Sequence, residues 1–393
     1  MPTVSIMKDT FAGLKNNYGF TSEIRNLLDV TQEDINDNDV IVFIRPNDLL
    51  SASIAKKTKK SGRFVITFCD DDLLRHKPMM PWRLKALKDT MKFSDVFWSP
   101  NSYLNEKYLN LTSGKRAVIL DTIIEEEQIE NYSEHHNEKI KIVYAANPSH
   151  VTTFDKIARA ALPEIIEKYG EKISFTFVSV HPELKEFEGK TEINYVKGMP
   201  LQEYRKFMAD QKFDIGLSPL NDDEFTRCKY FNKYIEYTMS GVCGIYSSVI
   251  PYVGAVKNEF NGLIAENSTE GWVKALELAI ENPKLRESCI INAQIDLREN
   301  FNEQDLMNNF VKDIPELVKF ENKKTYCKNF LLTKIMYRYF ILMDKIYKVI
   351  YFLKVGYLMI LLYIDALIAP SIHVQILLFL LDIIKRNHLV LIY

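Results

Sequence analysis

Residues 213–252 read FDIGLSPLNDDEFTRCKYFNKYIEYTMSGVCGIYSSVIPY and decide the fold. Phe213 to Leu217 is a short apolar run without the alternation of a half-exposed strand, so it predicts a buried parallel strand. A polar loop follows, and from about Lys229 the aromatic residues recur at helical spacing. Gly241 lies where a helix end favours a residue that tolerates positive φ. Val242 to Ser247 then predicts the next strand.

Three cations gather at the start of this predicted helix, namely Arg227, Lys229 and Lys233. The helix dipole favours anions at that end, so the cations are unfavourable there unless a phosphate group is the partner of both the side chains and the free backbone amides. Glu236 lies one helical turn past Lys233, and its carboxylate can accept two hydroxyl hydrogen bonds, as a ribose would offer. A phosphate and a ribose together indicate a nucleotide.

Five segments carry a resemblance to a known family: DIGLSPL, FTRCK, KYIEYTMSGV, SSVIPY and FNGLIAEN. Over roughly residues 139–301 the chain resembles the retaining "group 1" (glycosyltransferase family 4-like) glycosyltransferases, which have the GT-B fold. The resemblance implies that Glu236 holds the nucleotide ribose, and that Arg227 and Lys229 meet the pyrophosphate.

The loop after the second strand of this stretch, with Ser248 and Tyr252, resembles the sugar-side or ribose-side loop of the same family. Two positions depart from the family pattern. Many members carry a second Glu eight residues before the ribose-binding one, and here that position is Cys228. The usual Pro two residues after the helix-ending Gly is replaced by Cys243.

Length and composition set the outer bounds. A chain of 393 residues indicates two domains and an appendage, because single cores rarely exceed about 250 to 300 residues. The net charge of −2 gives no basic field for nucleic acid. Five cysteines without a CxxC motif indicate reduced thiols in a cytosolic protein, and the N-terminus lacks the pattern of a secretory signal.

Apolar runs alternate with helical patterns along most of the chain, which predicts an α/β protein with two Rossmann-like domains of parallel strands facing a cleft. We assign residues 1–138 to an acceptor-side domain, 139–322 to a nucleotide-sugar-binding domain and 323–393 to a helical tail. The expected strands are Val40–Ile44, Phe64–Phe68, Val96–Trp98, Ala117–Leu120, Ile140–Ala145, Ile173–Ser179 and Ile193–Val196. The expected helices of the second domain are Phe154–Tyr169, Leu201–Gln211, Thr269–Ile280 and Pro283–Glu299.

Near the N-terminus, FAGLKNNYGF predicts a loop because it contains Gly13 and Gly19, and Thr21 to Leu28 predicts the helix after it. The loop fits no phosphate-binding spacing, so an ordinary connection and an acceptor-side loop both stay open.

The acidic run Asp70, Asp71 and Asp72 follows a predicted strand end, where ligands of open α/β sheets bind. These carboxylates could act as a base or orient an acceptor hydroxyl, or they could cap a helix before Leu73. Metal ligation ranks below both, because the family that the chain resembles generally works without a metal.

Two further sets of polar residues have open interpretations. His150, on the turn after the first strand of the second domain, is either a structural residue or a contact to the donor phosphate. Asp222, Asp223 and Glu224 either serve the site or balance the cations that follow them.

The resemblance implies an enzyme that transfers a sugar, with retention, from a nucleotide diphosphate sugar to a hydroxyl of a glycan or lipid-linked acceptor in surface polysaccharide or glycoconjugate synthesis. Lys229 and Arg227 would stabilise the charge that develops on the leaving diphosphate, and Glu236 would fix the nucleoside end. We expect no metal or other cofactor. A sugar-nucleotide epimerase and an inactive scaffold of a polysaccharide assembly are the alternatives, and Cys228 keeps the second one open.

The tail differs in kind, since it carries eight Lys and Arg against three Asp from Tyr326 onward. Its cations Lys334, Arg338, Lys345 and Lys348 form one narrow helical stripe beside apolar residues, a pattern typical of a membrane surface. The later apolar runs are shorter than the ~20 residues that span a bilayer. We expect a cytoplasmic protein that is peripheral at the inner face of the membrane. Packing of the tail on the globular domains is the first alternative, and a tail that spans the membrane is the last.

Changing those four cations together to Gln should weaken binding to anionic vesicles, because each surface-bound cation contributes about 1 kcal/mol near such lipids. Flotation assays at low and high salt measure the loss, which should shrink as salt rises. Full-length protein that ignores vesicles, together with aggregation of a chain ending near Asn322, would instead support the packed tail.

Overall fold

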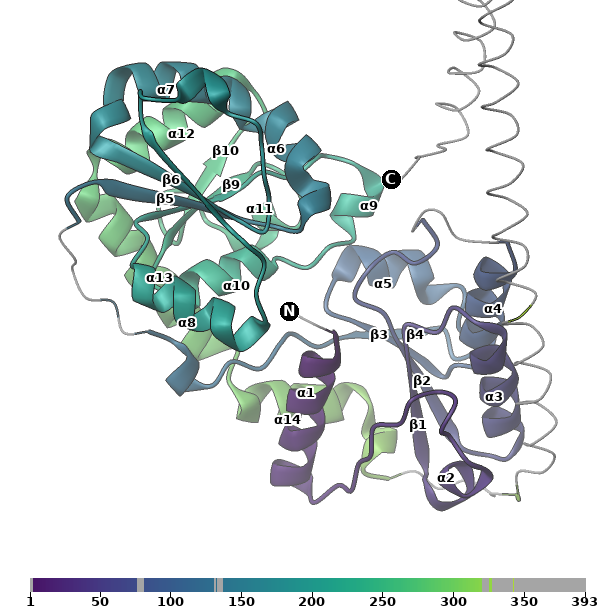
Figure 1. The fold of residues 1–393 in the computed structure, drawn as a ribbon. Helices are drawn as coiled ribbons and strands as arrows, with labels where there is room; N and C mark the ends of the chain where they lie inside the picture. The colour runs from purple at the N-terminus through teal and green to yellow at the C-terminus, as the bar shows by residue number, and fades with distance from the viewer. Residues whose placement is uncertain are drawn as a thin grey trace, which may run out of the picture.

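The computed structural model describes residues 3–75, 81–130, 132, 137–319, 325–326 and 342. These residues form two parallel sheets with helices around them (Figure 1). The first sheet has four strands, whose spatial order follows the chain: β1 (Val40–Ile44), β2 (Phe64–Phe68), β3 (Val96–Ser99) and β4 (Arg116–Ile119). All three pairings are parallel, as the sequence predicts.

The second sheet has six parallel strands in the order β10 (Leu263–Ala265), β9 (Cys243–Ser247), β8 (Ile215–Ser218), β5 (Ile140–Ala145), β6 (Ile173–Val178) and β7 (Glu192–Val196). From β5 the chain builds outward in one direction to β7, and it then returns to add β8 on the other side of β5. The strand order therefore reverses between β5 and β8, which is where open α/β sheets bind ligands.

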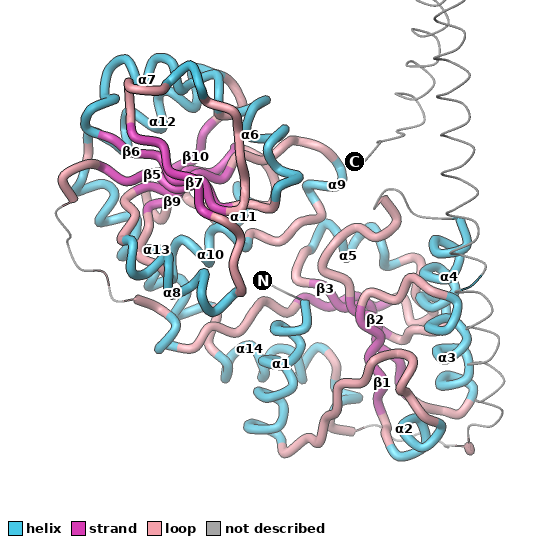
Figure 2. Tube along the Cα trace, viewed as in Figure 1, coloured by secondary structure: helices cyan, strands magenta, loops and turns pink. Residues whose placement is uncertain are grey.

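Helices cover both faces of the six-stranded sheet (Figure 2). One face packs against α6 (Val151–Ile157), α7 (Leu162–Tyr169) and α12 (Thr269–Glu281). The other packs against α8 (Leu201–Gln211), α10 (Asn232–Met239), α11 (Tyr252–Ala255) and α13 (Pro283–Asn300). A Cβ at Gly216 on β8 would lie 2.6 Å from the Tyr237 ring of α10, so this glycine allows the helix to approach the sheet. The approach fixes the start of α10 at the carboxyl end of β8.

The four-stranded sheet is covered by α1 (Thr3–Tyr18) and α14 (Glu303–Asp313) on one face. Its other face packs against α2 (Gln32–Asp37), α3 (Leu49–Lys60), α4 (Pro81–Lys92) and α5 (Ser102–Leu109). Helix α14 follows the six-stranded unit in sequence, yet the rings of Phe310 on α14 and Trp98 on β3 lie 4.7 Å apart. The end of the predicted second domain thus packs into the first, beside α1 (Figure 1).

The predicted helix over Thr21–Leu28 is wrong, because residues 19–26 are extended or irregular and the helix lies earlier, in α1. Gly13 indicated a loop but lies inside α1, where a Cβ would come within 3.0 Å of the Met307 side chain. The glycine therefore serves close packing of two helices. Gly19, with φ of +69°, follows the end of α1.

The other expected strands occur within two residues of their predicted bounds. The expected helix over residues 154–169 is interrupted by a 3₁₀ turn at Arg159–Ala161, and Pro163 lies in the first turn of α7, where its missing N–H costs nothing. The helix expected from about Lys229 begins only at Asn232, and a separate short helix α9 (Glu224–Arg227) precedes it.

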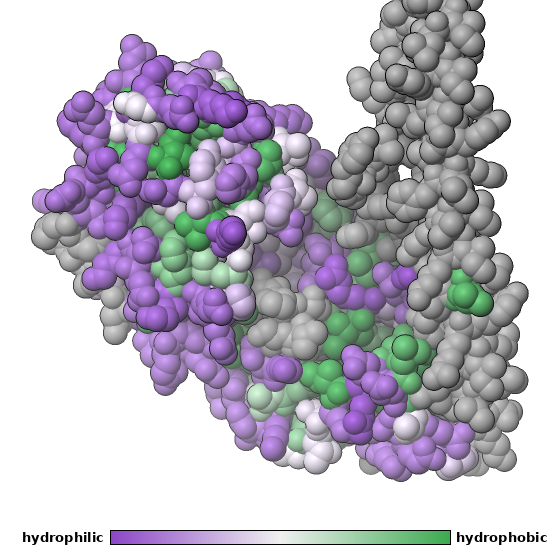
Figure 3. All heavy atoms as spheres, viewed as in Figure 1, coloured by the Kyte–Doolittle hydropathy of each residue, from purple (hydrophilic) through white to green (hydrophobic). Residues whose placement is uncertain are grey.

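Hydrophilic residues cover most of the visible surface of the six-stranded unit, whereas hydrophobic residues gather on the visible face of the four-stranded one (Figure 3). Within the described part of the chain, no helix combines the length and apolar character needed to cross a bilayer. The basic stripe and the apolar runs of the predicted tail lie outside the described residues.

Candidate functional site

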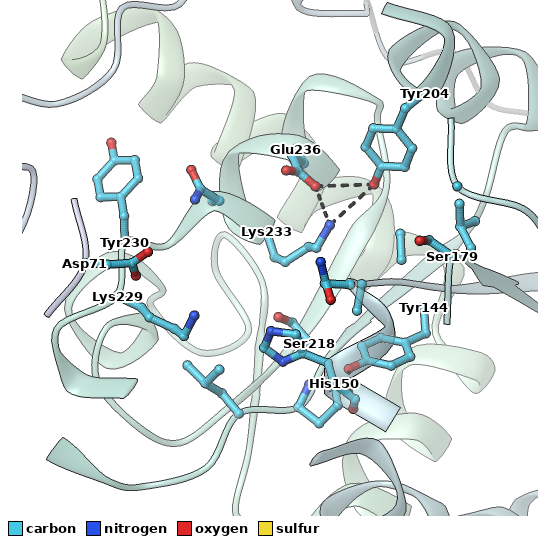
Figure 4. Close-up of a pocket in the computed structure, with 18 of the residues that line it drawn as sticks. Asp71, Tyr144, His150, Ser179, Tyr204, Ser218, Lys229, Tyr230, Lys233 and Glu236 are labelled. Carbon is cyan, nitrogen blue, oxygen red and sulfur yellow. Dashed lines mark hydrogen bonds and ion pairs between the residues drawn. The ribbon is translucent and has the colours of Figure 1, made fainter. Parts of the chain in front are cut away.

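A cavity of about 640 Å³ lies between the two sheets, at the carboxyl ends of their strands. The first domain contributes the residues that follow β1, β2 and β3, and the second contributes the residues that follow β5, β6 and β8 together with the start of α10. Its polar and charged lining residues are Arg45, Asp70, Asp71, Tyr144, Asn147, His150, Ser179, Tyr204, Ser218, Lys229, Tyr230, Asn232, Lys233, Glu236 and Tyr252 (Figure 4).

Glu236 and Lys233 form an ion pair at the wall of this cavity, and both are half-buried. Burial raises the pKa of the Glu236 carboxyl. The charge and hydrogen bond of Lys233 lower this pKa by more than burial raises it, so the net pKa lies below its usual range. The Tyr204 hydroxyl donates to the same carboxylate over 3.3 Å. Figure 4 shows the three side chains directed at one another. Glu236 is therefore a charged acceptor held in place from two sides.

Lys229 extends into the cavity separately from that pair (Figure 4). Its ammonium nitrogen lies 5.0 Å from the centroid of the Phe225 ring, and no carboxylate of the described residues is within ion-pair distance of it. Helix α10 starts nearby at Asn232, and its N-cap residue Phe231 provides no side-chain acceptor for the first amides. A cation beside uncapped helix amides forms a site for an anion.

The neighbouring His150 is affected by the positive charges of Lys229 and Lys233. Burial lowers the pKa of its imidazole, and the charges of Lys229 and Lys233 lower it further. Its ordinary value is 6.5, so the ring is neutral at pH 7 and can donate one N–H to a ligand. His150 therefore lines the cavity, and whether it contacts a phosphate stays a prediction.

The structure does not bring every predicted site residue into the cavity. Arg227 ends α9, forms an ion pair with Asp222 at 2.9 Å and is outside the cavity lining. Ser248 is also outside the lining, and its backbone N–H donates to the carbonyl of Ala265. Tyr252 does line the cavity, with its hydroxyl 2.6 Å from the Ser218 hydroxyl.

Cys228 is fully buried, is outside the cavity lining and belongs to an apolar cluster of the first domain that includes Phe97 and Leu104. Burial raises the pKa of its thiol to about 12, so the thiol is not ionised at neutral pH. The position at which the resembled family carries its second Glu thus has a packing role here. A sugar ligand in this cavity meets no acidic side chain at that position.

The acids before Arg227 each have a structural partner. Besides the pair between Asp222 and Arg227, Asp223 caps α9 by accepting from the backbone N–H of Thr226 over 2.8 Å. Glu224 forms ion pairs with Lys107 and Arg75 of the first domain. Of these contacts, the pair between Asp222 and Arg227 matches the interpretation that the acids balance the cations that follow them, whereas Asp223 and Glu224 have other structural roles.

Asp70 and Asp71 lie at the edge of the cavity, opposite the second domain, and both form ion pairs with Arg45. Asp72 is buried instead and accepts from the Tyr108 hydroxyl over 2.8 Å. The alternative that these acids cap a helix before Leu73 is wrong, because Leu73 to Arg75 form a turn. In the part of the chain that the structure describes, no three His, Cys, Asp or Glu side chains are grouped as a metal site would require.

Four further residues that no sequence motif marks also line the cavity: Arg45, Tyr144, Ser179 and Tyr204. Arg45 and Ser179 directly follow strands and have positive φ angles of 49° and 63°. Residues that directly follow parallel strands meet at one edge of the sheet, where ligands bind. This position after a strand was the sequence signal that could have identified Arg45 and Ser179 as site residues. Tyr204 lies on α8, and nothing in its local sequence marks it.

No family model matches the sequence, and the search of curated proteins gives no match. Solved structures do match. HepE from Anabaena in complex with UDP-glucose aligns over 78% of this chain and 89% of its own, with a TM-score of 0.54 and 10% identity. Sucrose-phosphate synthase from Thermosynechococcus elongatus aligns over 80% of this chain and 78% of its own, with a TM-score of 0.52 and 10% identity.

TarM also aligns, with a TM-score of 0.48 and 12% identity, and this chain spans about half of its length. At 10% identity, the alignments with HepE and sucrose-phosphate synthase show the architecture alone. The chain has the GT-B fold, in which two Rossmann-like domains with parallel sheets face a common cleft.

Replacing Glu236 by Ala removes the charged acceptor from the cavity wall. If it binds the ribose hydroxyls, the affinity for a nucleoside diphosphate should fall by about 1.5 to 3 kcal/mol, the range for hydrogen bonds to a charged group. Titration calorimetry with UDP measures this change. Glu277→Ala on α12 is the control, because it breaks the 2.7 Å ion pair with Lys168 away from the cavity and should leave UDP affinity unchanged.

Proposed function

We propose that this protein is a glycosyltransferase that moves a sugar from a nucleoside diphosphate donor to a hydroxyl group of an acceptor. The proposal rests on one observation: among the described residues, the ammonium of Lys229 has no carboxylate partner. It lies in a cavity that also contains the start of α10 and the charged acceptor Glu236. This arrangement offers one site for a diphosphate and another for a ribose within the same cavity. HepE, which has the same fold, forms a complex with UDP-glucose.

The chemistry assigned to Lys229 is electrostatic. When the bond between the anomeric carbon and the diphosphate oxygen breaks, negative charge develops on the leaving diphosphate. An ammonium and helix amides that are already in position stabilise that charge with little reorganisation. Lys229 is accordingly the catalytic residue of the proposal, and Glu236 fixes the nucleoside so that the bond to be broken lies beside Lys229.

The acceptor would enter from the side of the first domain, where Arg45, Asp70 and Asp71 line the cavity. The backbone of Arg45 lies in the left-handed region, at φ of 49°, and such strain in a non-glycine residue concentrates at binding sites. The two aspartates can accept hydrogen bonds from acceptor hydroxyls. The same proposal includes a glycan or lipid-linked acceptor, transfer with retention and a role in surface polysaccharide synthesis, which the family resemblance supports. It also includes a peripheral position at the membrane, which the basic tail supports.

We further propose that turnover needs no divalent ion. Lys229 and the amides of α10 supply positive charge to the leaving diphosphate, so EDTA should reduce the initial rate by less than about twofold. A metal-dependent sugar-nucleotide enzyme, assayed in the same buffer, is the control for effective chelation. Loss of activity in EDTA and recovery with Mg²⁺ or Mn²⁺ would contradict this part of the proposal.

A panel of nucleotide sugars tests the function itself. Each donor is incubated with the protein, with and without membrane lipids or oligosaccharides as acceptors, and release of the nucleoside diphosphate is measured. The proposal expects release from at least one donor, lowered at least about tenfold in Lys229→Ala, as loss of a charge contact would cause. Conversion of the donor sugar without release would indicate an epimerase. Absence of UDP, GDP and ADP binding would indicate a scaffold.

A further inference from the structure

The segment from Glu224 to Tyr230 belongs to the second domain by sequence but is held by the first. It connects β8 to α10, and it ends beside the phosphate site proposed above. Lys107 on α5 forms a 2.9 Å ion pair with Glu224, and Cys228 packs into the apolar cluster of the first domain. At its end, the Tyr230 hydroxyl accepts from the backbone N–H of Thr122 over 3.4 Å.

The central contact of this segment is made by Asn101, which lies between β3 and α5 and is only 7% exposed. Its Nδ2 donates to the backbone carbonyl of Lys229 over 2.6 Å and to that of Arg227 over 3.1 Å. Its Oδ1 accepts from the backbone N–H of Leu104 over 2.9 Å and so caps α5. One amide therefore joins a helix of the first domain to the backbone of the residue that faces the phosphate site.

The orientation of this amide is fixed by chemistry. Both carbonyls can only accept and the Leu104 amide can only donate, so the Asn101 side chain has a single orientation that satisfies all three. Its own backbone is held too, because its N–H donates to the Ser99 hydroxyl over 3.2 Å. Asn101 is thus a rigid reference point in the first domain, and the carbonyl of Lys229 is tied to it.

We infer that Asn101 is a positioning residue of the donor site, which holds the backbone at Lys229 so that the ammonium faces the diphosphate only while the two domains are in contact. The ligand in this inference rests on the proposed function. The hydrogen bonds from Asn101 to the carbonyls of Arg227 and Lys229, here called the clamp, do not depend on it. Domain contact and phosphate binding are then coupled: a donor diphosphate bound by Lys229 strengthens the contact between the domains, and separation of the domains releases the Lys229 backbone.

The variant Asn101→Asp tests the clamp without removing the helix cap of α5. Aspartate keeps the oxygen that caps α5, but it places a second oxygen against two carbonyls in place of the donor. The matched control is Asn282→Asp, which removes a 2.9 Å bond from Nδ2 to the Leu278 carbonyl at an exposed helix end away from the cavity. Thermal unfolding checks that both variants are folded.

The first measurement needs no ligand. Hydrogen–deuterium exchange of the amides in residues 224–230 should accelerate by about tenfold or more in Asn101→Asp and stay unchanged in Asn282→Asp, since local opening follows the loss of local contacts. Unchanged exchange in Asn101→Asp would overturn the clamp, whatever the protein binds.

The second measurement is a double-mutant cycle read by UDP affinity. Asn101→Asp should raise the UDP dissociation constant about tenfold in the wild-type background and less than about twofold in Lys229→Ala, because the residue acts through Lys229. Equal losses in both backgrounds, or accelerated exchange with unchanged UDP affinity, would overturn the positioning role. Wild-type protein that does not bind UDP, GDP or ADP would contradict the proposed function instead, while the exchange data still decide the clamp.

Discussion

The charge of Lys229 needs a partner, and the described chain supplies none that is anionic. Its ammonium lies near the ring of Phe225, beside the uncapped start of α10 and near the neutral His150. Elsewhere in the cavity, opposite charges are matched: Lys233 with Glu236, and Arg45 with Asp70 and Asp71. An ammonium without an anionic partner, in a cavity between two sheets, favours the binding of an anionic ligand there. The proposed diphosphate site rests on this interaction.

The fold explains how such a cation is placed. The order of strands in the larger sheet reverses between β5 and β8, so the carboxyl ends of these strands and the start of α10 surround one opening. Gly216 allows α10 to lie close to β8, and the Tyr237 hydroxyl fixes it there by donating to the Leu217 carbonyl over 2.7 Å. The first domain closes the opening from the other side. Helix α14 returns to that domain and packs on its sheet, which adds a second connection between the halves.

The local parts of this structure were predictable. A five-residue apolar run such as Phe64–Phe68 is fully buried and is a strand, as its lack of alternation indicates. Gly241 has the positive φ that its place after a helix predicts. The spacing of Lys233 and Glu236 put both on the same helix and in the cavity.

The parts that depend on distant segments were not predictable. Gly13 indicated a loop because a glycine that packs against Met307 looks the same in sequence as one that turns the chain. Arg227 was expected beside Lys229 at the helix start, but it ends the separate short helix α9, and α10 begins only at Asn232. Asn101 contacts a residue 128 positions away, and no local pattern encodes that distance.

The most direct test is a crystal structure of the protein with UDP. The account predicts that the diphosphate oxygens lie about 2.7 to 3.2 Å from the Lys229 ammonium and from the first backbone amides of α10, with the ribose hydroxyls on the Glu236 carboxylate. UDP bound elsewhere, or in the cavity with Lys229 directed away from the diphosphate, would contradict it.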